Sequence, residues 1–180
     1  MRYASLDKLV IIIAGSGPTD RNCNSAGLNS NAFKMLADTL CQMGISSFRY
    51  DKRGIGESTK VGEEQCTLYD RVDDVNAVSN YFADNFDQII LYGHSEGALV
   101  ATVAGTQQHI DGCILASGTS VTLDKIILEQ TAQYTRLTPM LEKHFDEIRR
   151  GDTLSEIHVV ARSIMRPSSF KQVLACTLWS

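Results

Sequence analysis

The sequence lacks features that would mark several classes of protein. Its 180 residues carry a net charge of −4, without the basic excess that nucleic-acid-binding proteins use, so we predict no nucleic-acid partner. The longest apolar run, Leu9 to Ala14, is far too short for a membrane span. Asp7 precedes that run and no small-residue cleavage pattern accompanies it, which argues against a secretory signal peptide. These absences indicate a soluble protein.

Cysteine is scarce and irregularly spaced. The five cysteines are odd in number and form no C-x-x-C pair, so they predict neither a disulfide framework nor a zinc site: Cys23, Cys41, Cys66, Cys113 and Cys176. None has a local sequence typical of a catalytic cysteine. Free thiols indicate a reducing compartment, and we predict a cytoplasmic protein. The sequence gives no reason to expect a metal or an organic cofactor.

Strand and helix signals alternate up to Gly118. Apolar segments predict four strands and helical spacing predicts three helices between them; the strands are 8–14, 45–50, 88–92 and 112–116, and the helices are 31–43, 68–82 and 95–106. Because the strands are apolar throughout, we predict an α/β fold in which a parallel sheet has helices on both faces. We expect Asn29 or Ser30 to cap the first helix and Gly44 to end it.

The alternation stops after Gly118. Three helices are predicted beyond it, through Leu128 and Tyr134, through Leu141 and Ile148, and through Ile157 and Ile164. Helices that follow a parallel strand predict a cap over the carboxyl edge of the sheet, and ordinary covering helices are the alternative. We therefore expect a partial α/β core at residues 1–118, a helical cap at 119–168 and an atypical tail at 169–180.

The segment Gly93-His94-Ser95-Glu96-Gly97 lies between a predicted strand and a predicted helix. In that setting G-x-S-x-G predicts a sharp turn that holds the Ser95 hydroxyl at the carboxyl edge of the sheet as a nucleophile. The two glycines leave room for the close approach of neighbouring backbone. An incidental tight turn is the alternative.

Two glycine-rich loops follow the first two predicted strands. In the first, residues 14–22, the Ser16 N–H is placed to stabilise an oxyanion together with the N–H of Glu96. The alternative of a phosphate-binding loop fits neither of the usual glycine patterns. In the second, residues 49–58, we expect Asp51 and Arg53 to tie the turn by charge-assisted hydrogen bonds. We do not assign Asp51 as a triad acid.

These segments resemble the α/β-hydrolase superfamily, and more narrowly its bacterial esterase and peptidase-like members. IIIAGSGPTDRN, RYDKRGIGES and LYGHSEGA occur in the family's order, and the resemblance covers residues 8–118 well and the cap loosely. It implies a serine hydrolase that acts on small-molecule carboxylic esters or related acyl compounds through an acyl-enzyme at Ser95. Ser16 and Glu96 would be the oxyanion donors.

The same resemblance implies a triad acid and a histidine after later strands, and we identify neither. We expect His109, His144 and His158 on solvated surfaces and the His94 side chain turned away from Ser95. Because a serine without its base is a poor nucleophile, we expect impaired activity in a chain truncated at both ends. One alternative is a non-catalytic binding protein that retains the crevice. Another is a homodimer in which a second chain supplies the acid and the histidine.

Overall fold

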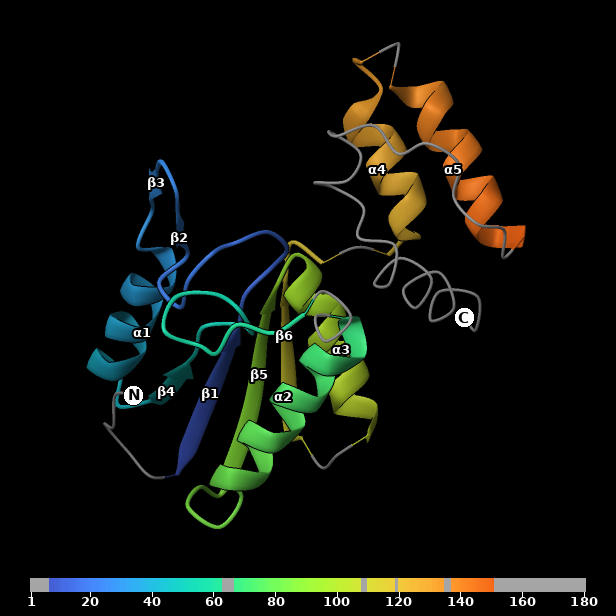
Figure 1. Cartoon of the computed structure of the whole chain (residues 1–180). Coiled ribbons are helices and arrows are strands. Elements are labelled where there is room, and N and C mark those ends of the chain that lie inside the picture. The colour runs from blue at the N-terminus through green and yellow to red at the C-terminus, as the bar shows by residue number, and fades with distance from the viewer. Residues whose placement is uncertain (1–6, 63–66, 108–109, 119, 135–136, 151–180) are drawn as a thin grey trace. The chain divides into compact units, whose positions relative to one another are not determined.

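Four segments form one parallel sheet in the computed structural model, which describes residues 7–62, 67–107, 110–118, 120–134 and 137–150. The strand order is β4-β1-β5-β6 (Figure 1), with β1 at Lys8–Ile13, β4 at Ser46–Arg49, β5 at Gln88–His94 and β6 at Gly112–Ala116. The predicted parallel sheet is therefore confirmed. An antiparallel hairpin in the loop after β1 was not predicted; its strands are β2 (Asn24–Ser25) and β3 (Leu28–Asn29).

Strand β1 lies in the middle of the sheet and is fully apolar after its first residue. Ile11 is paired with Phe48 of β4 on one side and with Leu91 of β5 on the other. Ile11 and Leu9, which lies two residues before it, are both 0% exposed. A strand needs apolar side chains in both directions only when both faces of its sheet are covered.

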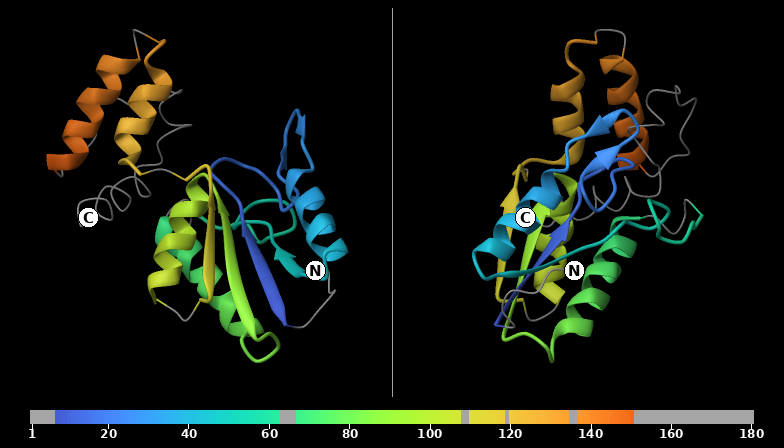
Figure 2. Two further views of the ribbon diagram at one scale, coloured as in Figure 1. Left: turned by 180° about the vertical axis from the view of Figure 1, so that it is seen from behind. Right: turned by 90° about the vertical axis from the view of Figure 1, so that its left-hand side faces the viewer.

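Helices cover the two faces of the sheet in different numbers (Figure 2). Helix α1 (Ala32–Gln42) covers one face, where Phe33 and Ala37 pack against Val10 and Ile12. Helices α2 (Leu68–Phe82) and α3 (Glu96–Gln107) lie on the other face and pack against each other. Because side chains alternate along a strand, the intervening residues of β1 point toward this second pair.

The first helix begins one residue later than its predicted caps allow. Its N-cap is Asn31, with φ 50°, so the expectation of Asn29 or Ser30 was wrong. The physical reason is a pairing with the preceding hairpin: the Asn31 N–H donates to Asn24 Oδ1 at 2.8 Å, and Asn24 Nδ2 donates to Asn31 Oδ1 at 3.0 Å. The predicted stop is confirmed, since Gly44 follows the helix with φ 78°.

The chain divides into two compact units, Met1–Gly118 and Thr119–Ser180. In the second unit α4 (Leu123–Thr131) packs against α5 (Thr138–Arg150). The predicted first helix of this region ends at Thr131, short of Tyr134, and the predicted helix through Ile157 and Ile164 lies outside the described residues. Within the described ranges, no helix has both the length and the apolar character needed to cross a membrane.

His144 does not lie on a solvated face, and that expectation was wrong. His144 is 2% exposed, and its Nδ1 donates to the carbonyl oxygen of Met140 at 2.6 Å. Leu141, Phe145 and Ile148 are also buried on α5. Together with His144 they occupy positions three and four residues apart, which is one face of a helix. The helical period therefore places His144 on the packed face, despite the charged residues beside it in sequence.

Candidate active site

Ser95 is the single residue that connects β5 to α3. Its φ is 54°, a left-handed conformation that is costly for a residue with a Cβ. Two backbone hydrogen bonds hold it there: the Ser95 N–H donates to Ala116 O, and the Ser95 carbonyl accepts from the Ala98 N–H, both at 2.9 Å. The residue is exposed, so its hydroxyl is accessible. The structure thus presents one strained, accessible serine at the carboxyl end of β5.

The glycines on either side of Ser95 lie against other backbone. A Cβ added at Gly93 would lie 2.2 Å from the carbonyl oxygen of Gly97. One added at Gly97 would lie 2.4 Å from the carbonyl oxygen of Ile13 and 2.8 Å from that of Ala14. Real Cβ atoms do not approach carbonyl oxygens so closely. Glycine at position 93 lets the first turn of α3 pack directly on β5, and glycine at position 97 lets the same turn pack on the end of β1.

The loop after β1 lies beside Ser95. A Cβ built on Gly15 would lie 3.1 Å from Ser95 Cβ and 3.0 Å from the carbonyl oxygen of His94. This proximity follows from the sheet, because β1 and β5 are neighbouring parallel strands whose carboxyl ends meet at the same edge. The structure therefore brings the loop that carries Ser16 next to the turn that carries Ser95 and Glu96.

Glu96 is the first residue of α3, and its side chain is paired with a neighbouring helix. Its Oε2 lies 2.9 Å from Nη1 of Arg71 on α2, and both side chains are largely buried. The first N–H groups of a helix have no partner within the helix, so the Glu96 N–H belongs to the set that can bind an anion. The ion pair offsets the negative charge of the Glu96 carboxylate close to that position. Sequence reasoning did not single out Arg71.

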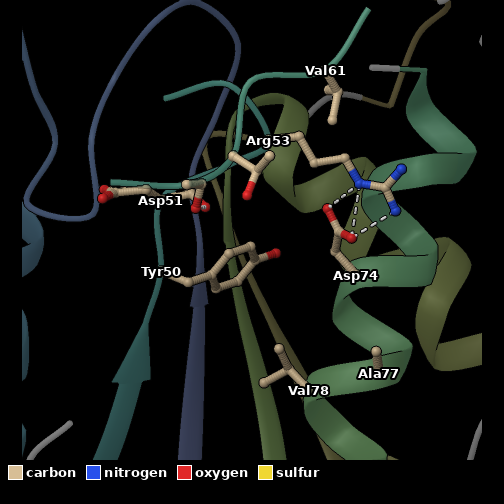
Figure 3. A pocket seen from close by; sticks show the side chains of 9 residues that line it. Tyr50, Asp51, Arg53, Val61, Asp74, Ala77 and Val78 are labelled. Atoms are coloured by element: carbon tan, nitrogen blue, oxygen red, sulfur yellow. Dashed lines mark hydrogen bonds and ion pairs between the residues drawn. The ribbon is translucent and has the colours of Figure 1, made fainter. Parts of the chain in front are cut away.

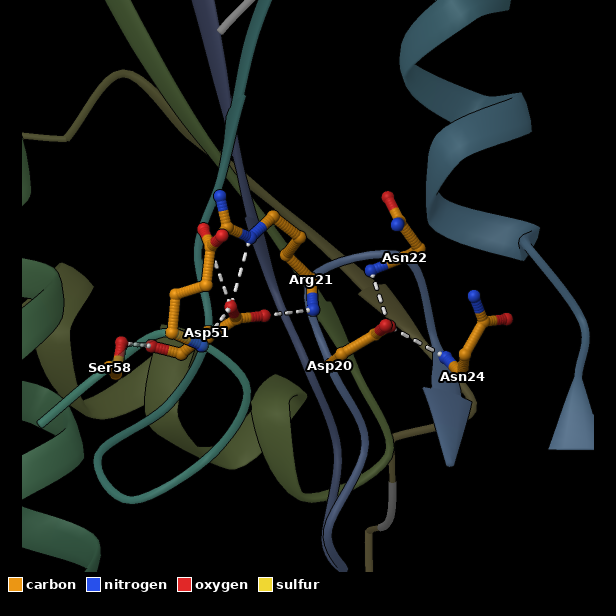
Figure 4. Close-up of polar contacts among 7 residues, drawn as sticks. Asp20, Arg21, Asn22, Asn24, Asp51 and Ser58 are labelled. Atoms are coloured by element: carbon orange, nitrogen blue, oxygen red, sulfur yellow. Dashed lines mark hydrogen bonds and ion pairs between the residues drawn. The ribbon is translucent and has the colours of Figure 1, made fainter. Parts of the chain in front are cut away.

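Asp51 joins the second glycine-rich loop to the first. Arg21 donates its backbone N–H to Asp51 Oδ1 at 2.6 Å, and its Nε and Nη2 to Oδ2 at 3.0 and 2.6 Å (Figure 4). The backbone N–H of Glu57 adds a bond to Oδ2 at 3.1 Å. Burial raises the pKa of Asp51, but the hydrogen bonds from Arg21 and Glu57 more than offset it, so the pKa lies below its ordinary value.

The first loop is also braced internally. Asp20 Oδ1 accepts from the backbone N–H groups of Asn22 and Asn24, each at 2.8 Å (Figure 4). The side chain of Lys52 enters the same loop from the strand-end segment after β4. Its Nζ donates to the carbonyl oxygens of Gly15 and Gly17. Nothing in the local sequence distinguishes Lys52 from an exposed lysine, and sequence reasoning missed it.

Arg53 links the second loop to α2. Its Nε and Nη2 donate to Asp74 Oδ1 at 3.0 and 2.8 Å, and its Nη1 donates to Asp70 Oδ1 at 3.1 Å. Arg53 and Asp74 line a cavity of about 470 Å³ together with Tyr50 and Val78 (Figure 3). Burial raises the pKa of the Tyr50 phenol, and the charge of Asp74 adds to the effect. This cavity is separate from the turn at Ser95, which does not line it.

The histidines give no partner for Ser95 that we can assign. The His94 ring makes an edge contact with Phe33 of α1, with 6.0 Å between the ring centroids. His144 is hydrogen-bonded within α5 of the second unit, and His109 and His158 lie outside the described residues. In the part of the chain that the structure describes, no group of three or more histidine, cysteine, aspartate or glutamate residues could hold a metal ion.

The family is decided by a match that covers most of the chain. The family model described as "Serine aminopeptidase, S33" matches residues 23–163. The chain belongs to this family of α/β hydrolases. The membership agrees with the parallel sheet and its flanking helices, and with the family resemblance of the sequence. No curated protein matches the sequence.

Solved α/β-hydrolase structures share the fold at low sequence identity. A lipase-esterase related protein from Clostridium acetobutylicum is 18% identical with a TM-score of 0.54, over 99% of this chain and 69% of that one. A thermophilic esterase from Thermogutta terrifontis is 22% identical with a TM-score of 0.51, over 83% and 51%. A proline iminopeptidase-related protein from Thermus thermophilus is 18% identical with a TM-score of 0.51, over 69% and 40%. The chain thus spans between 40% and 69% of the lengths of these three proteins.

Proposed function

We propose that this chain is a serine hydrolase that attacks carboxylic esters or related acyl compounds of small size through Ser95. The observation that carries the proposal is the exposed Ser95 at φ 54°, with the loop that bears Ser16 packed against it. Backbone strain at an accessible serine is costly, and it persists where the surrounding structure enforces it for function. Membership of a hydrolase family supports the same chemistry.

In the proposed reaction, Ser95 Oγ bonds to the acyl carbon and gives its proton to solvent water, while the carbonyl π electrons move to the carbonyl oxygen. The N–H groups of Ser16 and Glu96 would donate hydrogen bonds to that oxyanion. Collapse of the tetrahedral intermediate breaks the bond to the leaving alkoxide, which takes up a proton. A water molecule then adds to the acyl carbon and the bond to Ser95 Oγ breaks. The carboxylic acid leaves, and Ser95 Oγ takes up a proton from the attacking water. Because no base is assigned, the oxyanion donors and substrate binding are the sources of rate enhancement that we can name. In serine proteases that lack a triad member, these two retain a rate about 10³- to 10⁴-fold above that of the uncatalysed reaction in water.

The second candidate is a non-catalytic binding protein that retains the crevice beside Ser95. It is favoured by His94, the histidine next to Ser95 in the sequence, whose ring packs on Phe33 of α1. The two candidates differ in one measurable property, which is the nucleophilicity of the Ser95 hydroxyl.

We expect a fluorophosphonate probe to label the full chain at Ser95, with labelling abolished by Ser95→Ala. Peptide mapping by mass spectrometry locates the adduct. Ser117→Ala is the matched control, because Ser117 is also exposed and also left-handed, with φ 52°, yet does not lie between the two glycines. It should label like the wild type. A wild-type chain that unfolds cooperatively in urea but takes up no probe would contradict the hydrolase and support the binding protein.

A further inference from the structure

We infer that Lys52 is a positioning residue for the oxyanion loop, an inference that rests on the proposed function. Lys52 is 7% exposed although it carries a charged ammonium. Its Nζ donates to Gly15 O at 2.5 Å and to Gly17 O at 2.6 Å, and it lies 3.4 Å from Thr19 Oγ1. Burying an ammonium is expensive unless carbonyl or carboxylate oxygens replace its water. Here the replacing oxygens belong to the loop that carries Ser16.

The geometry of one peptide unit connects Lys52 to the oxyanion donor. The carbonyl of Gly15 and the N–H of Ser16 belong to the same planar peptide group. In a trans peptide the two bonds point in opposite directions. The described backbone contains no cis peptide bond. An ammonium that holds the Gly15 oxygen on one side therefore fixes the direction of the Ser16 N–H on the other.

The second contact stops the loop from turning about that peptide. Gly17 lies on the other side of Ser16 and has φ 78°, so the chain bends back and offers its carbonyl to the same Nζ. A single ammonium thus holds the Gly15–Ser16 and Gly17–Pro18 peptide groups, which lie on either side of the Ser16–Gly17 peptide. Ser16 itself is exposed, so the loop has little packing of its own to fix the residue.

The charge of Lys52 has a second consequence for the same N–H. A cation bound to the carbonyl oxygen of a peptide draws electron density from its nitrogen, and hydrogen bonds in a chain polarise one another. The Ser16 N–H becomes a stronger donor to a developing oxyanion. Lys52 therefore acts through the Gly15–Ser16 peptide without touching the substrate.

Saturation kinetics of fluorophosphonate labelling test this role. Lys52→Met should lower the maximal labelling rate of Ser95 by about 10- to 100-fold, somewhat less than complete loss of an oxyanion donor costs. The probe concentration at half-maximal rate should change by less than about threefold, because the clamp acts on the transition state. Lys52→Arg keeps cationic donors and should recover much of the rate. Lys34→Met is the matched control, since Lys34 is exposed and its ion pair with Asp38 lies along α1.

Each outcome separates this inference from the proposed function. No labelling of the wild type defeats the proposed function. Wild-type labelling with an unchanged maximal rate in Lys52→Met overturns the role of Lys52 alone. A loss of rate that Lys52→Arg does not relieve, with equal loss of urea stability in both variants, assigns Lys52 a structural role and also overturns it. If Lys52→Met does not unfold cooperatively, Lys52→Gln, which keeps a neutral donor, replaces it with the same expectations.

Discussion

Gly93→Ala is expected to lower the free energy of unfolding by about 3 kcal/mol, the upper end of the usual cost of overpacking. The added methyl would lie 2.2 Å from the carbonyl oxygen and 2.5 Å from the carbonyl carbon of Gly97, and 2.6 Å from Ala98 Cα. All three atoms are backbone, so no side chain can rotate away. Relief requires the first turn of α3 to move from β5, which also moves Ser95. Urea unfolding measures the stability loss, and fluorophosphonate labelling should slow in the fraction that remains folded.

The matched control for this substitution is Gly112→Ala. Gly112 begins β6, and a Cβ there would meet nothing within 4 Å. Its replacement should change the unfolding free energy by less than about 1 kcal/mol, because only the entropy of the unfolded backbone changes. Similar costs at Gly93 and Gly112 would show that the close contact beneath Ser95 does not exist in solution.

The second large effect is expected for Asp51→Asn, with a loss of about 3 kcal/mol at neutral pH. The Asp51 side chain is 3% exposed and binds the Arg21 guanidinium at 2.6 Å. Asparagine fills the same space but removes the charge, and one of its two polar atoms becomes a donor facing the donors of Arg21. Urea unfolding at pH 7 measures the loss in the free energy of unfolding. Both loops that Asp51 joins should become less stable.

The same variant has a defined pH dependence. The folded-state pKa of Asp51 lies below its ordinary value of 3.8, so its contribution to stability is present above that pH and is lost as the pH falls through the folded pKa. The stability difference between wild type and Asp51→Asn should therefore be constant near neutrality and shrink below about pH 4. A difference that stays the same down to pH 3 would mean that the Asp51 charge contributes nothing.

Glu57→Gln serves as the control for Asp51→Asn. Glu57 also pairs with Arg21, at 2.7 Å, but its side chain is 85% exposed. Exposed ion pairs contribute no more than about 1 kcal/mol, because water and salt screen them. Loss of Glu57's charge should leave stability nearly unchanged. If both variants lose the same free energy of unfolding, the burial of the Asp51 carboxylate does not make its ion pair with Arg21 stronger than that of the exposed Glu57.

Local patterns account for most of the fold. Strand signals predicted the four parallel strands, and β6 has the bounds that were predicted, Gly112–Ala116. Helical spacing predicted α2 with its observed bounds, Leu68–Phe82. The place of Ser95 between strand and helix was equally local, since strand propensity, helix propensity and two glycines all lie within a few residues of it. These features can be predicted from the sequence because each depends on residues that are neighbours along the chain.

The contacts around the site depend on residues far apart in the chain. Lys52 reaches Gly15 across 37 positions, and Arg21 reaches Asp51 across 30. Composition and periodicity thus determine which segments are strands, which are helices, and where the strained serine stands. Only the parallel arrangement of β1, β4 and β5 decides which loops meet at their carboxyl ends, because it brings into contact side chains that the sequence separates.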